Sequence, residues 1–442
     1  MTEHFPEAPD AARRAFPDNS ESINMNAPIN HSHLSVVPLP QRAKKKRPVL
    51  TGWLTGAVKD MNDNIVPNVA NALLGLRQAD QLADALGFDE MWQAPVLMKP
   101  VPGGPCPGPF PRMVRDNDVT LIQAWLQREG LPKLSKDTAH QAVDQRASER
   151  SFHPIRDHLS TLKWDGKPRI AGWLSNYLGA ERTPYHSSIG RMFLIAMVAR
   201  VHKPGCKADY MLILEGDQGM RKSAACAILA GKEWFSDNLR DFSSKDASAH
   251  LRGKWLIEVG ELSALNRSDT EAVKAFITRT DERYRAAYGR RELHEPRQCL
   301  FVGTTNRPTY LRDETGNRRF WPVKTGCLYL EGLERDRDQL FAEAVHAFRN
   351  GDQWWPDELF EKEQIKPEQE ARREVDPWEE LIREYLATTE RVRVNDIARH
   401  VLAIEVANVG TREQRRISGV LAALGWRPYS SNGVRWYIPS RQ

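Results

Sequence analysis

The 442-residue sequence is poor in the features that define several specialised classes of protein. It has only five cysteines and no Cys-x-x-Cys pair, so neither a zinc site nor a disulfide framework is predicted. No apolar run approaches the roughly 18 residues that a membrane-spanning helix needs, and the N-terminus lacks the apolar stretch of a signal peptide. We therefore expect a cytoplasmic protein that does not insert into a membrane.

A strong overall charge is also lacking. The net charge is only +5 at pH 7, and this small excess does not by itself indicate a nucleic-acid partner. Hydrophobic residues make up 40% of the chain, enough for a sizeable core, and the length fits two or three domains. Residues 1–50 are rich in Pro, Asn, Ser and His and predict a disordered tail. Their basic cluster at 42–47 is either a contact for DNA phosphates or a solvated linker.

The order of apolar patterns predicts an α/β protein with several parts. Apolar residues at helical spacing in 66–86 and 116–128 predict a helical N-terminal domain over residues 51–175. Short apolar runs at 211–214, 255–259 and 299–302 alternate with helical patterns, which indicates an α/β domain over 176–356. The charged segment 357–390 is predicted to be a linker helix. Residues 391–442 read helix, helix, hairpin, a winged-helix-like pattern.

The stretch 211–230 has the order strand, glycine-rich turn, Lys-Ser, helix. A phosphate-binding loop requires this order, because turn N–H groups and a helix N-terminus hold the phosphates. Lys222 would contact the β- and γ-phosphates of ATP, and Ser223 would ligate Mg²⁺. Arg221 departs from the motif, since it stands where a second glycine is expected, and a turn followed by a surface lysine is the alternative interpretation. The predicted nucleotide-binding residues are Gly216, Asp217, Gln218, Gly219, Met220, Arg221, Lys222, Ser223 and Ala224.

Polar side chains at the ends of the following strands predict the remaining catalytic parts. Glu258 and Glu261 end the next apolar strand, and we assign Glu258 to the Mg²⁺ shell and Glu261 to polarising water, although these roles could be exchanged. Asn306 ends the third strand, where it would orient water, or it simply caps the strand. Arg318 and Arg319 follow a turn at Gly316-Asn317. One of them would reach a neighbouring subunit's nucleotide as an arginine finger, or one pairs with an acid of its own subunit.

Two basic stretches predict contacts with single-stranded and duplex DNA. Arg, Tyr and Gly interleave in 274–294, where guanidinium groups suit phosphates and Tyr rings suit bases, although a solvated loop is the alternative. The segment from Arg391 to Gln442 contains nine arginines and only three acidic residues. A basic recognition helix is therefore expected, and a protein-interaction domain is the alternative. The predicted DNA-binding residues are Lys274, Arg285, Arg290, Arg291, His294, Arg412, Arg415 and Arg416.

The ordered motifs from about residue 151 to 355 resemble the virulence-associated E family of P-loop ATPases, which are related to superfamily 3 helicases and phage primase-helicases. The motifs that carry the resemblance are 152–154, 162–166, 214–216, 218–219, 222–223, 234–237, 274–276, 303–306, 316–322 and 337–339. The resemblance implies an AAA+-like core that assembles into a ring, with a hexamer as the expected form. It also implies that 274–294 is a DNA-contacting hairpin. A primase activity is not supported, because no acidic triad is found in the first 150 residues.

These features predict an ATP-dependent DNA helicase or replication initiator of a phage, plasmid or integrated mobile element. Mg-ATP would bind between Lys222 and Ser223 of one subunit and Arg318 or Arg319 of the next. The alternative is an ATP-switched DNA-binding regulator with weak or no hydrolysis, which the departure at Arg221 would suit. A scaffold with a decayed site is a third possibility, against which Glu258 and Asn306 argue.

Overall fold

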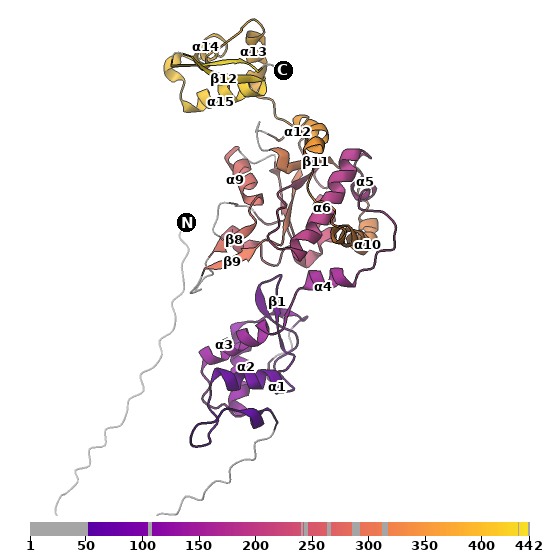
Figure 1. The fold of residues 1–442 in the computed structure, drawn as a ribbon, viewed down its shortest axis with the longest axis vertical. Coiled ribbons are helices and arrows are strands. Elements are labelled where there is room, and N and C mark those ends of the chain that lie inside the picture. The colour runs from indigo at the N-terminus through magenta and orange to yellow at the C-terminus, as the bar shows by residue number, and fades with distance from the viewer. Residues whose placement is uncertain are drawn as a thin grey trace, which may run out of the picture. The chain divides into compact units, whose positions relative to one another are not determined.

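The computed structural model describes residues 52–104, 108–239, 242, 246–262, 267–284, 292–311, 317–431 and 433–440 (Figure 1). The chain divides into two units, Met1–Leu50 and Thr51–Gln442, and every described residue belongs to the second. The predicted disordered tail lies outside the described residues. Within the described part, no helix is long and apolar enough to cross a membrane.

The N-terminal domain combines three helices with a small sheet. Its elements are η1 (Gly52–Gly56), α1 (Val69–Gln78), β1 (Leu86–Asp89), β2 (Ala94–Leu97), β3 (Arg112–Met113), α2 (Asp116–Arg128), α3 (Lys136–Ser148) and β4 (Ser151–Phe152). The strand order is β3-β2-β1-β4. The expectation of a helical domain is therefore corrected: helix 116–128 is confirmed, but 66–86 is helical only to Gln78. Strands this short show too little two-residue alternation to be recognised.

The central domain follows as an α/β unit. Its elements are α4 (Pro154–Thr161), α5 (Trp173–Leu178), α6 (Pro184–His202), β5 (Met211–Glu215), α7 (Lys222–Ala230), η2 (Lys232–Trp234), β6 (Phe235–Ser236), α8 (Asp246–His250), β7 (Leu256–Val259), α9 (Arg267–Ile277), β8 (Asp281–Tyr284), β9 (Leu293–Pro296), β10 (Leu300–Thr305), η4 (Asn317–Arg319), β11 (Phe320–Lys324) and α10 (Leu330–Arg349). Five strands form one sheet in the order β11-β5-β10-β7-β6, and all their pairings are parallel. The predicted alternation of strands and helices is confirmed.

Helices cover both faces of this parallel sheet. Leu212 and Leu214 of β5 pack in one cluster with residues of α6, α7 and α10. Met211 and Ile213 belong to a second cluster with residues of α9. Successive strand side chains point to opposite faces, so a strand that is covered on both sides must be apolar throughout. This explains the continuous apolar run that precedes the glycine-rich turn.

Strands β8 and β9 stand apart from the central sheet as an antiparallel pair. Their register runs from Asp281 opposite Pro296 to Tyr284 opposite Leu293. The buried Arg297 guanidinium fixes the base of this hairpin, since it pairs with Glu282 and donates to the carbonyl of Phe276. Residues 285–291, between the strands, lie outside the described residues.

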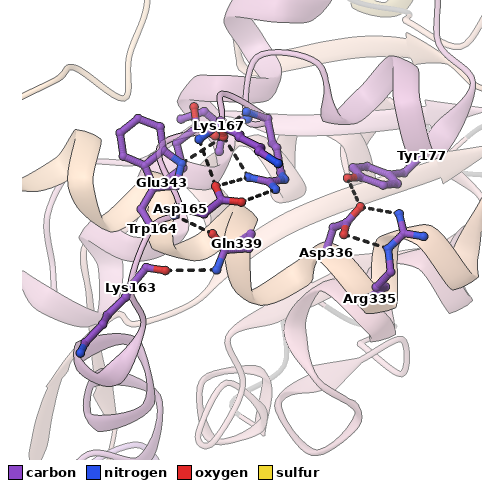
Figure 2. Close-up of polar contacts among 11 residues, drawn as sticks. Lys163, Trp164, Asp165, Lys167, Tyr177, Arg335, Asp336, Gln339 and Glu343 are labelled. Atoms are coloured by element: carbon purple, nitrogen blue, oxygen red, sulfur yellow. Dashed lines mark hydrogen bonds and ion pairs between the residues drawn. The ribbon is translucent and has the colours of Figure 1, made fainter.

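The segment 163–170, which follows α4, is joined to helix α10 by the polar contacts in Figure 2. The backbone N–H of Asp165 donates to Gln339 Oε1 at 3.0 Å, and Gln339 Nε2 donates to the Lys163 carbonyl at 3.1 Å. Glu343 accepts from the N–H of Ile170 at 3.0 Å. Two stretches that carry the family resemblance, 162–166 and 337–339, thus contact one another, and these contacts join the segment to α10.

The C-terminal part is larger than the sequence indicated. Its elements are α11 (Glu358–Phe360), η5 (Glu361–Ile365), α12 (Lys366–Glu370), α13 (Pro377–Leu386), α14 (Val394–His400), η6 (Val406–Asn408), α15 (Thr411–Ala423), β12 (Trp426–Ser431) and β13 (Val434–Pro439). Ile365 packs into the central core, whereas Ile382 and Leu386 of α13 share a cluster with Ile397 and Ile417. The segment 357–390 is therefore not one linker helix, and α13 belongs to the C-terminal module.

Candidate functional site

The glycine-rich turn joins β5 to α7 at the carboxyl edge of the parallel sheet. Gly216 has φ 159° and Gly219 has φ 87°, and the Gly216 N–H donates to the Thr305 carbonyl of β10 at 3.1 Å. The first N–H groups of a helix have no partner within the helix, so those of α7 are available to an anion at this edge. Carboxyl ends of parallel strands are where open α/β sheets bind ligands.

Lys222 begins α7 and turns its side chain back over the loop. It is 8% exposed, and its Nζ donates to the carbonyls of Gly216 at 2.6 Å and Asp217 at 2.9 Å. Burial lowers the pKa of Lys222, and the nearby Glu258 carboxylate opposes this shift. A phosphate in the loop would favour the charged form further, since an opposite charge raises the pKa of an amine.

The backbone conformation at Arg221 shows how the turn accommodates an arginine where the motif has glycine. The Arg221 φ of 63° lies in the left-handed region, the conformation that glycine adopts at no steric cost. An L-residue pays roughly 1–2 kcal/mol to stay there. The backbone therefore has the shape that the missing glycine would give it, and the Arg221 side chain is exposed.

Two substitutions at Arg221 should separate backbone shape from side-chain chemistry. We expect Arg221→Gly to bind ATP about as well as the natural chain, because glycine keeps φ near 63°. Arg221→Val should bind at least about tenfold more weakly, since a β-branched residue is a strong outlier at positive φ. Equilibrium titration with a fluorescent ATP analogue measures both. Equal losses in the two variants would show that the guanidinium, and not the turn, is what matters.

Ser223, Glu258 and Thr304 meet beside the loop. Ser223 Oγ donates to Glu258 Oε1 at 2.9 Å, and Thr304 Oγ1 donates to the same oxygen at 2.7 Å. Glu258 is 3% exposed, and its Oε2 is buried with no hydrogen-bond partner among the described residues. A buried, unpartnered carboxylate oxygen is costly unless a cation or donor joins it. The donor set of one hydroxyl and one carboxylate suits Mg²⁺, which keeps waters and phosphate oxygens as its other ligands.

The described residues hold no cluster of three or more His, Cys, Asp or Glu side chains able to bind a metal by themselves. A metal at Glu258 would therefore depend on the nucleotide for further ligands. Such dependence is the usual behaviour of Mg²⁺ at phosphate sites.

Glu261 and Asn306 each follow a strand of the parallel sheet that contributes to the cluster of Ser223, Glu258 and Thr304. Asn306 directly follows β10, whose Thr305 is level with Glu215 of β5, so Asn306 lies beside the loop at the carboxyl edge. Glu261 follows β7 with φ 51° and an exposed side chain. Both residues are open to solvent, as a water-handling group requires.

A buried ion pair holds the last residue of the loop strand. Glu215 Oε1 accepts from Arg372 Nε and from the Tyr310 hydroxyl, each at 2.8 Å, and Oε2 accepts from Arg372 Nη2 at 3.1 Å. Burial, and then the Glu215 carboxylate, raise the pKa of Tyr310 well above its ordinary value, so its hydroxyl stays a donor. These contacts were not predicted, because Arg372 lies in a charged segment without a motif.

Removing the Arg372 guanidinium should destabilise the fold strongly. In Arg372→Met the Glu215 carboxylate stays buried with only Tyr310 as a partner, and breaking a buried pair costs about 3–5 kcal/mol. The matched control is Arg335→Met, because Arg335 is 64% exposed and pairs with Asp336 on the surface (Figure 2). The control should not change stability measurably. Urea unfolding followed by circular dichroism compares the variants, and equal midpoints would refute the assignment.

Helix α10 fixes the far end of α7. Arg337 Nε donates to the Leu229 carbonyl at 2.9 Å, and Nη2 donates to the Ala230 carbonyl at 3.1 Å. A cation at a helix C-terminus satisfies carbonyls that have no partner within the helix. Arg337 thereby sets the position of the helix that presents Lys222 and Ser223. Arg337 belongs to 337–339, a stretch that carries the family resemblance, but its contact with the end of α7 was not predicted.

Arg318 and Arg319 lie at the amino ends of the parallel strands, whereas the loop lies at their carboxyl ends. They immediately precede β11, which runs parallel to β5 with Phe320 level with Met211 and Lys324 level with Glu215. At about 3.3 Å per residue, the amino end of β5 is on the order of 13 Å from the end that carries the loop. Both guanidinium groups also oppose the rise in the Tyr210 pKa, to about 12, that burial causes. The pair is therefore remote from the loop of its own chain.

Of the predicted DNA-binding residues in 274–294, one is buried, one is exposed and three lie outside the described residues. Lys274 is 3% exposed, lies over the Phe320 ring and donates to Glu271 at 3.2 Å, so it does not present its charge on the surface. His294 is exposed on β9 and lies 3.4 Å from Asp281. Arg285, Arg290 and Arg291 lie outside the described residues.

The three arginines of α15 differ in their surroundings. Arg416 pairs with Asp376 through Nε at 2.8 Å and Nη2 at 2.9 Å, and it lies 3.7 Å above the Trp378 ring. It therefore links α13 to α15, and its predicted DNA contact stays a prediction. Arg412 and Arg415 are exposed, and neither has an ion pair among the described residues. Without an ion pair in the described part of the chain, these two are the stronger candidates for phosphate contacts on α15.

Comparisons with known proteins find a family model that matches the central part of the chain. A family model described as "Virulence-associated protein E-like domain" matches residues 159–374. Two solved structures are similar over 80% of this chain and 95% of theirs: "The apo structure of NrS-1 C terminal region", at 13% identity and a TM-score of 0.43, and an A form of the same region, at 14% and 0.40. No curated protein matches.

Proposed function

The chain contains a virulence-associated protein E-like domain, residues 159–374, and we propose that this domain is a Mg²⁺-dependent ATPase that drives a DNA motor or replication initiator. The observation that carries the proposal is the meeting of Ser223, Glu258 and Thr304 beside Lys222. Two hydroxyl groups, one buried carboxylate with an oxygen unpartnered among the described residues, and one lysine lie together at a glycine-rich turn. That set suits a nucleoside triphosphate and its metal ion.

The residues of the site take distinct roles in this proposal. The loop 216–224 holds the phosphates through its N–H groups, and Lys222 leaves the carbonyls of Gly216 and Asp217 to contact the β- and γ-phosphates. Ser223 and Glu258 hold Mg²⁺, which would neutralise charge on the phosphates. Glu261 and Asn306 orient the attacking water. The P-loop and AAA+-like character of the domain is part of this proposal.

The remote arginine pair supports hydrolysis between subunits. Since Arg318 and Arg319 lie at the amino edge of their own sheet, they serve a nucleotide only across a subunit boundary. A repeated head-to-tail interface closes into a ring when the rotation between neighbouring subunits completes a full turn, and it forms a filament when it does not. We therefore propose a homo-oligomeric ring, with a hexamer as the expected form.

Two elements are proposed to contact DNA. The hairpin β8–β9 has Arg283 and His294 at exposed positions, and the predicted contacts Arg285, Arg290 and Arg291 come between its two strands in the sequence. The C-terminal module has three helices followed by a two-stranded sheet, an order that supports a winged helix with α15 as its recognition helix. Arg412 and Arg415 on α15 would neutralise phosphates of duplex DNA.

Steady-state ATPase assays with and without single-stranded DNA test the function. We expect multiple turnovers that depend on Mg²⁺ and that DNA accelerates. ATP binding without turnover would favour the alternative, an ATP-switched DNA-binding regulator. Absence of ATP binding would refute the nucleotide site altogether.

A further inference from the structure

The two-stranded sheet of the C-terminal module has one face turned away from α15. Tyr437 is 2% exposed, and its hydroxyl donates to Ser418 of α15 at 2.9 Å, so Tyr437 lies on the inner face. Its neighbours Trp436 and Ile438 therefore lie on the opposite face, because side chains alternate along a strand. The register places Tyr429 opposite Trp436 and Arg427 opposite Ile438. We call these four residues the outer face.

A short extended segment adds two arginines to this face. Val392 pairs with Tyr437 through backbone hydrogen bonds of 3.0 and 2.7 Å, and its side chain is buried. Its neighbours Arg391 and Arg393 consequently point outward, and their guanidinium groups lie 4.6 and 5.0 Å from the Trp436 ring centroid. Arg393 also pairs with Asp396. Arg391 has no ion pair among the described residues.

The composition of the outer face suits unpaired nucleotides. Tyr429 is 52% exposed, so one face of its ring is accessible to a ligand. An aromatic ring beside exposed guanidinium groups stacks a base and neutralises its phosphates, which is how single strands are held. Duplex DNA hides the faces of its bases by stacking, so only a single strand offers them. The positive charge of Arg391 and Arg427 favours a polyanion over a neutral apolar partner.

We propose that the outer face binds single-stranded DNA, separately from the duplex contacts of α15. The inference rests on the proposed DNA-binding role of the module and extends it to a second face. The module would thereby hold one unpaired strand on Tyr429 and a duplex on Arg412 and Arg415. This arrangement fits a junction between duplex and single strand.

Fluorescence anisotropy of the full chain with labelled oligo(dT) and with a labelled duplex tests the proposal. Tyr429→Ala should weaken oligo(dT) binding about fivefold or more, since stacking is worth about 1–3 kcal/mol per base, and should leave duplex binding unchanged. Tyr429→Phe keeps the ring and should retain the affinity. The control Arg412→Ala/Arg415→Ala should show the reverse pattern, with the duplex affected more.

A crosslinking measurement distinguishes this face from any other single-strand site in the chain. Oligonucleotides carrying 5-iododeoxyuridine should crosslink to the peptide that contains Tyr429, and Tyr429→Ala should remove that crosslink. Unchanged oligo(dT) affinity together with no crosslink there would overturn the inference, while a duplex defect in the α15 variant would leave the DNA-binding role standing. A uridine oligonucleotide that binds much more tightly than oligo(dT) would reassign the face to RNA. If no variant on either face alters DNA binding, the DNA-binding role of the module fails as well.

Discussion

Lys222→Ala should reduce ATP turnover on the order of 10²-fold or more, the loss typical when one preorganised charged donor is removed from a reacting centre. Lys222 is the buried cation that the glycine-rich turn encloses, and its two present partners are carbonyls that cannot compete with a phosphate. Its removal therefore takes away the one lysine positioned for the γ-phosphate. Steady-state phosphate release with saturating Mg-ATP measures the effect.

The matched control is Lys232→Ala. Lys232 lies beyond the opposite end of α7, in η2, and is exposed, so its loss should leave turnover unchanged. Thermal unfolding of both variants should show that the fold survives, because alanine is a good helix former at the first position of α7. Turnover by Lys222→Ala at the natural rate, in a correctly folded protein, would falsify the assignment of the loop.

The sequence was informative wherever a local pattern repeats a structural period. The runs 211–214, 255–259 and 299–302 became β5, β7 and β10 within one residue at their starts, because strands buried on both faces must be continuously apolar. Strand β11 was not predicted, because Pro322 interrupts its apolar run and proline is unusual inside a strand. The small N-terminal sheet escaped because its strands have two to four residues.

Long-range pairing explains what the sequence could not show in the site. Glu215 and Arg372 are 157 positions apart, and no local rule links them. Lys274 has the residue type of a DNA contact, yet its helix turns it inward against Phe320, which depends on how α9 packs on the sheet. Glu258 was predicted for the metal, but its shared contact with Ser223 and Thr304 required the parallel register of β7 and β10.

Removing both arginines of η4 should spare ATP binding but lower hydrolysis heavily. Arginine fingers contribute about 10³-fold or more to turnover. Because Arg318 and Arg319 lie at the amino edge of the sheet, they cannot reach the loop of their own chain, and their binding contribution there should be negligible. Equilibrium ATP titration of Arg318→Ala/Arg319→Ala comes first, since a loss of binding would make the pair a structural element.

Mixing two inactive variants then tests whether the finger acts between subunits. A Lys222→Ala subunit keeps its arginine pair, and an Arg318→Ala/Arg319→Ala subunit keeps its loop. In an equal mixture, half of the loops are intact and half of these face an intact pair, so about a quarter of the interfaces of a head-to-tail ring regain both parts. We expect turnover to recover toward that fraction after subunit exchange. A mixture as inactive as its components would mean that the pair does not complete a neighbour's site, because the geometry of β11 already excludes its own.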